Sequence, residues 1–246
     1  MLTGRQLKGA RALLGIPRSK LAERMSIPRL TVKIAESSDG ECPITIARAR
    51  QIQGYLDDIA RAFAHVIDSK SPFTSGHSER VAVYADLVAA ELDYDAARRR
   101  WLSRAALLHD IGKLGVSNAV LDKPGKLDDE QWREMREHAT LSESILWRVA
   151  AFRDMALIGG AHHERLDGLG YPRGLAGDAI ALDTRIVSVA DVFDALTADR
   201  PYRAAMPVER ALGIMREDLG LALDPICFAA LERALVAMEA KLGLAA

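Results

Sequence analysis

Apolar residues recur along most of the chain with the three-to-four-residue spacing of amphipathic helices. The clearest stripes run from Val81 to Leu92, from Ile186 to Leu196 and from Phe228 to Met238. No segment alternates in the period of two that a half-buried strand requires, and only the Gly/Pro-rich stretch 168–178 offers a short hairpin. The pattern predicts an all-α fold in which each stripe faces the core.

The first 44 residues form a smaller unit within this pattern. Apolar positions over 7–14, 19–24 and 28–36 predict three short helices, which the polar loop 37–43 ends. A continuous helical pattern over 45–66 then predicts a connecting helix, and residues 67–246 hold the remaining stripes. We therefore expect a small helical module, a connecting helix and a larger helical bundle.

Composition agrees with a globular protein in the cytoplasm. Of 246 residues, 49% are hydrophobic and 27% charged. No apolar run reaches the roughly 18 residues of a membrane span, and the basic N-terminus lacks the apolar core of a secretory signal. Cys42 and Cys227 lie far apart, which favours reduced thiols. The sequence predicts no membrane partner.

Charge is unevenly distributed and marks the N-terminal unit. Residues 1–50 hold ten Lys/Arg and four Asp/Glu, whereas the other 196 hold 23 and 30. The pattern Leu21-Ala22, the turn 25–28, Val32 and Glu36 resembles a phage-repressor helix-turn-helix, although Ser26 stands where glycine is usual. This resemblance implies a DNA partner; the alternative is a protein-docking or dimerisation module whose basic residues form a solvated face.

Histidines and aspartates supply the candidate chemistry. An aspartate in the apolar segment 188–195 is costly unless it is paired or metal-bound, and paired histidines beside a Gly/Pro-rich loop pack poorly in a core. The sixth histidine, His65, lies in the connecting helix and is expected to be structural. Helix bundles build metal sites from such residues on several helices. The candidate ligands are His77, His109, Asp110, His138, His162, His163 and Asp191.

These residues lie in motifs that resemble the HD-GYP family, cyclic di-GMP phosphodiesterases of the HD phosphohydrolase superfamily. The resemblance covers about residues 67–235. It rests on His138 and on the segments 76–80 (GHSER), 109–113 (HDIGK), 123–127 (KPGKL), 162–172 (HHERLDGLGYP) and 191–203 (DVFDALTADRPYR), all in the family's order.

The resemblance implies an HD-type helical bundle that hydrolyses cyclic di-GMP to linear pGpG, with GMP as an open further product. It implies two divalent metals, iron or manganese, and a metal-bridging hydroxide that attacks phosphorus. One metal would be held by His77, His109, Asp110 and Asp191. The other would be held by Asp110, His138, His162 and His163. Asp110, with two carboxylate oxygens, would bridge them.

Substrate contacts also follow from the resemblance. Lys113 would contact the scissile phosphate or help the leaving oxygen, and Tyr171 lies in the loop expected to face the substrate. Arg200 and Arg203 would clamp phosphate, for which guanidinium is well shaped; the alternative is that they only pair with neighbouring carboxylates. Glu164 and Asp167 either orient the histidines or cap the loop.

Two departures from the family pattern affect the metal site. Ser71 replaces an aspartate six residues before His77, so a contact that steadies His77 is expected to be lost. Phe73 stands where three-metal members carry glutamate, which predicts two metals. Two rival functions remain. One is a DNA- or protein-binding regulator that senses a cyclic dinucleotide with weak or no turnover, and the other is a hydrolase of another cyclic dinucleotide or of a nucleotide phosphate ester. A homodimer also stays open.

Overall fold

The computed structural model describes residue 17 and residues 46–72, 74–199 and 204–242. The predicted helix-turn-helix module over 1–44 lies outside the described residues, apart from Pro17. Phe73, Arg200 and Arg203 lie outside them as well, so the predictions that rest on these three side chains stay predictions.

The described chain is a bundle of helices without strands, which confirms the predicted all-α class. Isolated bridges join Asp167 to Ala176, within the stretch that offered a hairpin, and Leu219 to Leu223. The elements are α4 (Ile46–Asp68), α5 (His77–Glu91), α6 (Ala96–Leu108), η1 (Ile111–Gly115), α7 (Asn118–Leu121), α8 (Asp129–Trp147), η2 (Arg153–Met155), α9 (Ala156–Gly159), η3 (Gly177–Ala179), α10 (Leu182–Thr197), α11 (Val208–Glu217) and α12 (Pro225–Leu242).

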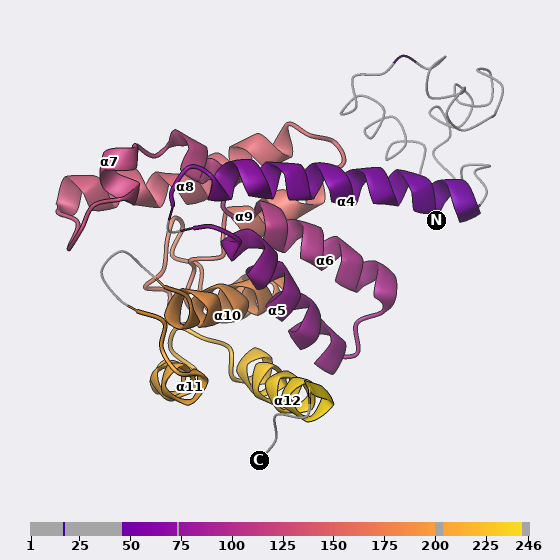
Figure 1. Cartoon of the computed structure of the whole chain (residues 1–246). Helices are drawn as coiled ribbons and strands as arrows, with labels where there is room; N and C mark the ends of the chain where they lie inside the picture. The colour runs from indigo at the N-terminus through magenta and orange to yellow at the C-terminus, as the bar shows by residue number, and fades with distance from the viewer. Residues whose placement is uncertain (1–16, 18–45, 73, 200–203, 243–246) are drawn as a thin grey trace.

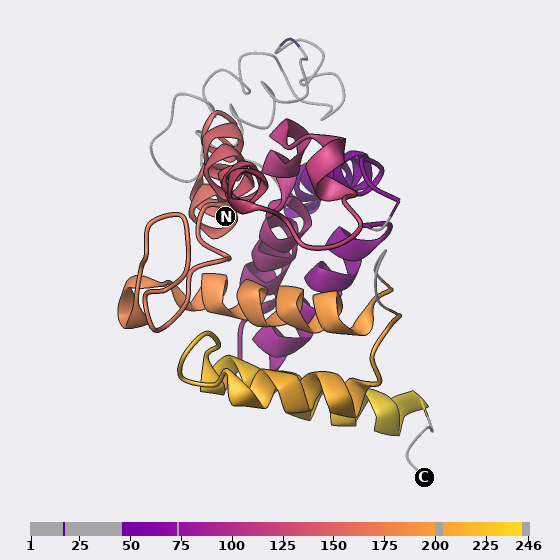
Figure 2. The ribbon, with the colours of Figure 1, turned by 90° about the vertical axis from the view of Figure 1, so that its left-hand side faces the viewer.

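Helix α5 lies at the centre of the bundle and packs against α6, α10 and α12 (Figure 1). Figure 2 shows α10 lying along α11 and α12, which it also contacts. Val81 and Val88 of α5, Ile186 of α10 and Leu231 of α12 are fully buried. The predicted stripes therefore meet in one core, because each presents an apolar face at helical spacing to the same interior.

The third stripe ends earlier than the sequence predicts. Phe228, Leu231 and Leu235 are buried, but Met238 is 36% exposed and residues 236–240 are all exposed. Within the part of the chain that the structure describes, the last turns of α12 are thus left uncovered by other helices. Assigning Met238 to the core was wrong, because helical spacing shows which face is apolar and not how far the neighbouring helices extend.

The helix predicted as a connection over 45–66 is α4, and it contributes to the core. Ile52, Leu56 and Ala60 are buried along its contact with α6, and the buried Arg104 of α6 pairs with Asp57 of α4. Figure 1 shows α4 lying across the top of the bundle. Within the described residues, none of the helices is both long and apolar enough to cross a membrane.

Candidate metal centre

The seven predicted ligands converge from five separate segments. His77 is the first residue of α5, and His109 and Asp110 join α6 to η1. His138 lies in α8, the pair 162–163 follows α9, and Asp191 lies in α10. Ligand atoms lie within 4.8 Å of one another inside each of two groups, namely Asp110, His138, His162 and His163, and His77, His109 and Asp191.

Asp110 lies between the two groups and presents one oxygen to each. Its Oδ2 is 3.5 Å from Nε2 of His77 and 3.3 Å from Nε2 of His109. Its Oδ1 is 3.4 Å from Nε2 of His138 and 3.6 Å from Nε2 of His162. Asp191 completes the group that contains His77 and His109, with its Oδ1 3.4 Å from Nε2 of His77. This is the arrangement that a carboxylate bridging two ions requires.

Backbone carbonyls fix the orientation of three of the histidine rings. In each of these rings, Nδ1 donates to the backbone carbonyl three residues earlier. His109 donates to Ala106 at 2.6 Å, His138 to Met135 at 2.6 Å and His162 to Gly159 at 2.9 Å. A proton held on Nδ1 leaves the Nε2 lone pair free. All three lone pairs therefore point into the cluster.

The cluster's own atoms fit a cation. Nε2 of His77, Nε2 of His109 and Oδ1 of Asp110 are buried without a hydrogen-bond partner. Nε2 of His138 and Nε2 of His162 face each other at 3.3 Å, although each ring holds its proton on Nδ1. Buried acceptors that face one another are costly unless a cation lies between them. The residues present therefore fit divalent metal ions.

Electrostatics favour the protonation states that bind metal at His138, His163 and Asp110. Burial lowers the pKa of His138 to about 4 and, together with the neighbouring His162, holds the pKa of His163 well below its usual range. Burial alone would raise the pKa of Asp110, but Lys113 and His109 outweigh it and hold that pKa well below its ordinary value. Neutral imidazoles and an ionised carboxylate are the forms that coordinate a metal.

His77 is supported by Asp194, which the sequence analysis did not identify. Nδ1 of His77 donates to Oδ2 of Asp194 at 2.7 Å, and Arg80 donates to both oxygens of this buried carboxylate. Burial disfavours a charge on His77, but Asp110 and Asp194 outweigh it and raise the pKa of His77 to about 9. The spacing Asp191-x-x-Asp194 in an apolar helix was the signal that could have revealed it.

Ser71 does not leave His77 without support, contrary to expectation. The Ser71 hydroxyl donates to Asp122 at 2.6 Å, so it joins the segment before α5 to the end of α7. The start of α5 is held by Asp68, which accepts hydrogen bonds from the backbone N–H and the hydroxyl of Ser78. The orienting carboxylate for His77 comes from α10 instead, a tertiary contact that local spacing cannot show.

Lys113 lies at the edge of the cluster. Its Nζ donates to Oδ2 of Asp110 at 2.5 Å, and its side chain is 19% exposed. It thus connects the buried carboxylate with the surface, where an anionic substrate would approach.

Gly112 packs closely against α8. A Cβ at this position would lie 1.9 Å from the carbonyl oxygen of His138 and 2.6 Å from the backbone nitrogen of Ser142. The Gly112 N–H also donates to the hydroxyl of Ser142 at 2.9 Å. Glycine at this position therefore allows η1 to approach α8, which places Asp110 beside His138.

The Gly/Pro-rich loop after the histidine pair is held by its own carboxylates. Glu164 accepts hydrogen bonds from the backbone N–H groups of Arg173 and Leu175, and Asp167 pairs with Arg165. Of the two roles considered for Glu164 and Asp167, the contacts support loop capping. The loop places Tyr171 against the metal cluster, with its ring 4.8 Å from that of His163.

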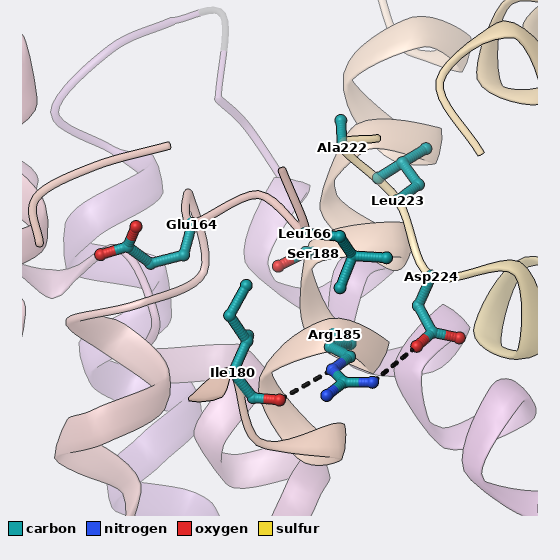
Figure 3. Close-up of a pocket in the computed structure, with 8 residues that line it drawn as sticks. All are labelled: Glu164, Leu166, Ile180, Arg185, Ser188, Ala222, Leu223 and Asp224. Carbon is teal, nitrogen blue, oxygen red and sulfur yellow. Dashed lines mark hydrogen bonds and ion pairs between the residues drawn. The ribbon is translucent and has the colours of Figure 1, made fainter. Parts of the chain in front are cut away.

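A hollow behind this loop is not a nucleotide site. Figure 3 shows Arg185 of α10 donating to the carbonyl of Ile180 and pairing with Asp224 at the start of α12. The hollow has a volume of about 10 Å³, barely that of one water molecule. The residues that line the hollow therefore connect the loop with α10 and α12. Its lining is Glu164, Leu166, Ile180, Arg185, Ser188, Ala222, Leu223 and Asp224.

Comparisons with known proteins show the family of the chain. A family model described as HD domain matches residues 61–226. The 3'3'-cGAMP-specific phosphodiesterase 3 of Vibrio cholerae is 61% identical over 181 residues, which cover 74% of this chain and 39% of that protein. The cyclic di-GMP phosphodiesterase response regulator RpfG of Xanthomonas campestris is 40% identical over 196 residues, covering 79% and 52%.

One solved structure supports the fold alone. Bd1817, an HDG"Y"P protein from Bdellovibrio bacteriovorus, aligns with a TM-score of 0.57 at 21% identity, over 77% of this chain and 63% of that one. The chain spans 39% and 52% of the length of the two curated relatives described above.

Proposed function

The chain belongs to the HD domain family, and we propose that it is a metal-dependent phosphodiesterase of the HD-GYP type that opens a 3′3′-cyclic dinucleotide. One observation carries the proposal. The two oxygens of the buried Asp110 each face a separate pair of histidine Nε2 atoms, at 3.3–3.6 Å. A pure binding protein has no need of such a two-sided arrangement.

We assign the ligands of two ions from this geometry. His77, His109, Asp110 and Asp191 would hold one ion, and Asp110, His138, His162 and His163 the other. Imidazole and carboxylate together suit iron or manganese. Two ions in these places would supply an activated water near neutral pH and would polarise the phosphate.

The protein's own residues bind and orient the substrate. Lys113 lies beside Asp110 with part of its side chain at the surface, so its ammonium can reach a non-bridging phosphate oxygen or the leaving 3′ oxygen. Tyr171 forms the wall next to His163. Arg200 and Arg203 remain the proposed clamp for phosphate.

Two cyclic dinucleotides are candidate substrates, and they differ in one purine base. The motifs favour cyclic di-GMP. The relative that is 61% identical is named as specific for 3'3'-cGAMP, whereas the relative named for cyclic di-GMP is 40% identical. The higher identity makes 3'3'-cGAMP the first candidate and cyclic di-GMP the second.

The test is hydrolysis of both nucleotides by anaerobically prepared full-length protein of measured metal content, with products identified by chromatography. We expect metal-dependent opening of at least one ring, and the ratio of the two kcat/KM values decides the substrate. Asp110→Asn is the inactive control. Tight nucleotide binding without turnover in the metal-loaded protein would contradict the proposal and favour a sensor.

A further inference from the structure

A strip of aromatic and cationic side chains leads from the metal centre to the surface of α8. The Tyr171 ring lies 4.8 Å from the His163 ring at an interplanar angle of 31°. The Arg136 guanidinium lies 5.3 Å from the centre of the Tyr171 ring and 5.8 Å from that of Trp132. The order from the metal centre outwards is therefore His163, Tyr171, Arg136 and Trp132.

The outer half of this strip is exposed. Trp132 is 44% exposed, and Arg136 is exposed one helical turn later on the same face of α8. Among the described residues, no hydrogen bond or ion pair of the Arg136 guanidinium is found, although acidic residues are common on this surface. A large aromatic face and an unpaired guanidinium thus lie together where a ligand can reach them.

The strip also lies at a suitable distance from the cluster. Trp132 precedes His138 by six residues of one continuous helix, about 9 Å of helical rise. The sugar and base of a nucleotide span a comparable length. Because Tyr171 contacts both His163 and Arg136, a base attached to a phosphate at the metal centre would lie along this strip, toward Arg136 and Trp132.

We propose that Trp132 and Arg136 form a guanine subsite, with the base stacked on Trp132 and its O6 and N7 atoms facing the Arg136 guanidinium. This inference rests on the proposed function and adds the element that selects a base. Aromatic side chains stack on any nucleobase, so Trp132 supplies affinity. A guanidinium donates two hydrogen bonds to O6 and N7 of guanine, whereas adenine presents an amino donor in place of O6.

The proposed subsite predicts which cyclic dinucleotides bind. Cyclic di-GMP and 3'3'-cGAMP each carry a guanine and satisfy it, whereas cyclic di-AMP does not. The subsite therefore requires one guanine and leaves the second base to other residues.

The stacking role is tested by calorimetric titration of the metal-loaded full chain with hydrolysis-resistant phosphorothioate analogues of cyclic di-GMP and cyclic di-AMP. Trp132→Ala should raise the Kd for the guanine analogue at least about fivefold, and Trp132→Phe should restore most of the affinity. Trp147→Ala is the matched control, because Trp147 is an exposed tryptophan on the same helix, 5.3 Å from Arg153. Equal Kd values for wild type and Trp132→Ala would overturn the inference.

The role of Arg136 in recognising guanine is tested by a second comparison. Arg136→Gln should reduce the preference for the guanine analogue over the adenine analogue at least about fivefold. Arg133→Gln, a change at a neighbouring exposed arginine of α8, should leave that preference unchanged. If Arg136→Gln weakens the binding of both analogues equally, the guanidinium contacts phosphate and the guanine assignment is wrong.

These titrations separate the subsite from the proposed function. Binding with the expected preference but without metal-dependent hydrolysis would contradict the proposed function and leave the subsite standing. Metal-dependent hydrolysis by the wild type, with unchanged affinity in the Trp132 and Arg136 variants, would contradict the subsite and leave the proposed function standing. A wild type that binds neither analogue would overturn the subsite.

Discussion

Individual side chains of the metal centre are held by partners that differ in kind. Three histidines rely on the carbonyl three residues earlier, which any helical turn provides. His77, the first residue of α5, has no preceding helical turn and relies on the Asp194 carboxylate from α10. Local backbone therefore supports three rings, and tertiary packing supports the fourth.

Asp110→Asn should abolish hydrolysis and lower the metal content. An amide offers one oxygen and no charge, so it cannot serve both histidine pairs. Metal analysis and turnover should fall together, while helical circular dichroism stays near wild type. Asp86→Asn, which alters a surface pair with Arg99, is the control. A variant at position 110 that turns over normally would contradict the bridging assignment.

Lys113→Ala should keep its metal and lose activity. The lysine contacts Asp110 from the outer side, so its removal leaves all seven proposed ligands in place. Loss of a cation that stabilises developing charge typically costs about 10²-fold or more in kcat. Lys126→Ala, at an exposed loop lysine, should behave like wild type. Loss of metal from Lys113→Ala would show a structural role instead.

At the scale of elements, the close approach of η1 to α8 places the two histidine pairs around one carboxylate. The approach depends on Gly112, because a side chain at this position would clash with the backbone of His138 and Ser142. A sequence shows that glycine is present but not which helix lies against it.

Gly112→Ala should destabilise the fold by about 1–3 kcal/mol, because the added Cβ forces η1 away from α8. The metal content should fall too, since Asp110 moves with η1. Gly54→Ala in α4 is the control: its Cβ would meet nothing within 4 Å, and alanine favours a helix by up to about 1 kcal/mol. Urea unfolding measures the stability of both variants. Equal midpoints for Gly112→Ala and wild type would contradict the packing argument.

At the scale of the whole molecule, the described part of the fold and the convergence of the seven proposed ligands were predictable from sequence, for different physical reasons. Helical spacing revealed the core stripes, and a costly aspartate in the apolar segment 188–195 indicated a ligand. The contact of Asp194 with His77 and the strip formed by Trp132 and Arg136 were not predictable. They depend on how separate segments meet, and surface side chains carry no periodic signal.

Removing metal should lower the melting temperature of the whole protein. An ion that binds only the folded chain, at about 100 times its Kd, stabilises the chain by about 2.7 kcal/mol, so each bound ion raises the melting temperature by about 5–10 °C for a chain of this size. Differential scanning calorimetry before and after chelation measures the shift, and adding metal back should reverse it. Asp110→Asn should show no comparable shift; an equal shift in that variant would place the stabilising ions elsewhere.

The spread of the ligands along the chain has a consequence for its synthesis. His77 and Asp191 are 114 positions apart, which corresponds to about 6–23 s at about 5–20 residues per second. The group of Asp110, His138, His162 and His163 is fully translated 28 residues before Asp191. On the ribosome, a nascent chain thus exposes one complete set of ligands while the other still lacks its last member. On the proposed assignment, the ion held by Asp110, His138, His162 and His163 is therefore expected to bind before the ion that also needs Asp191.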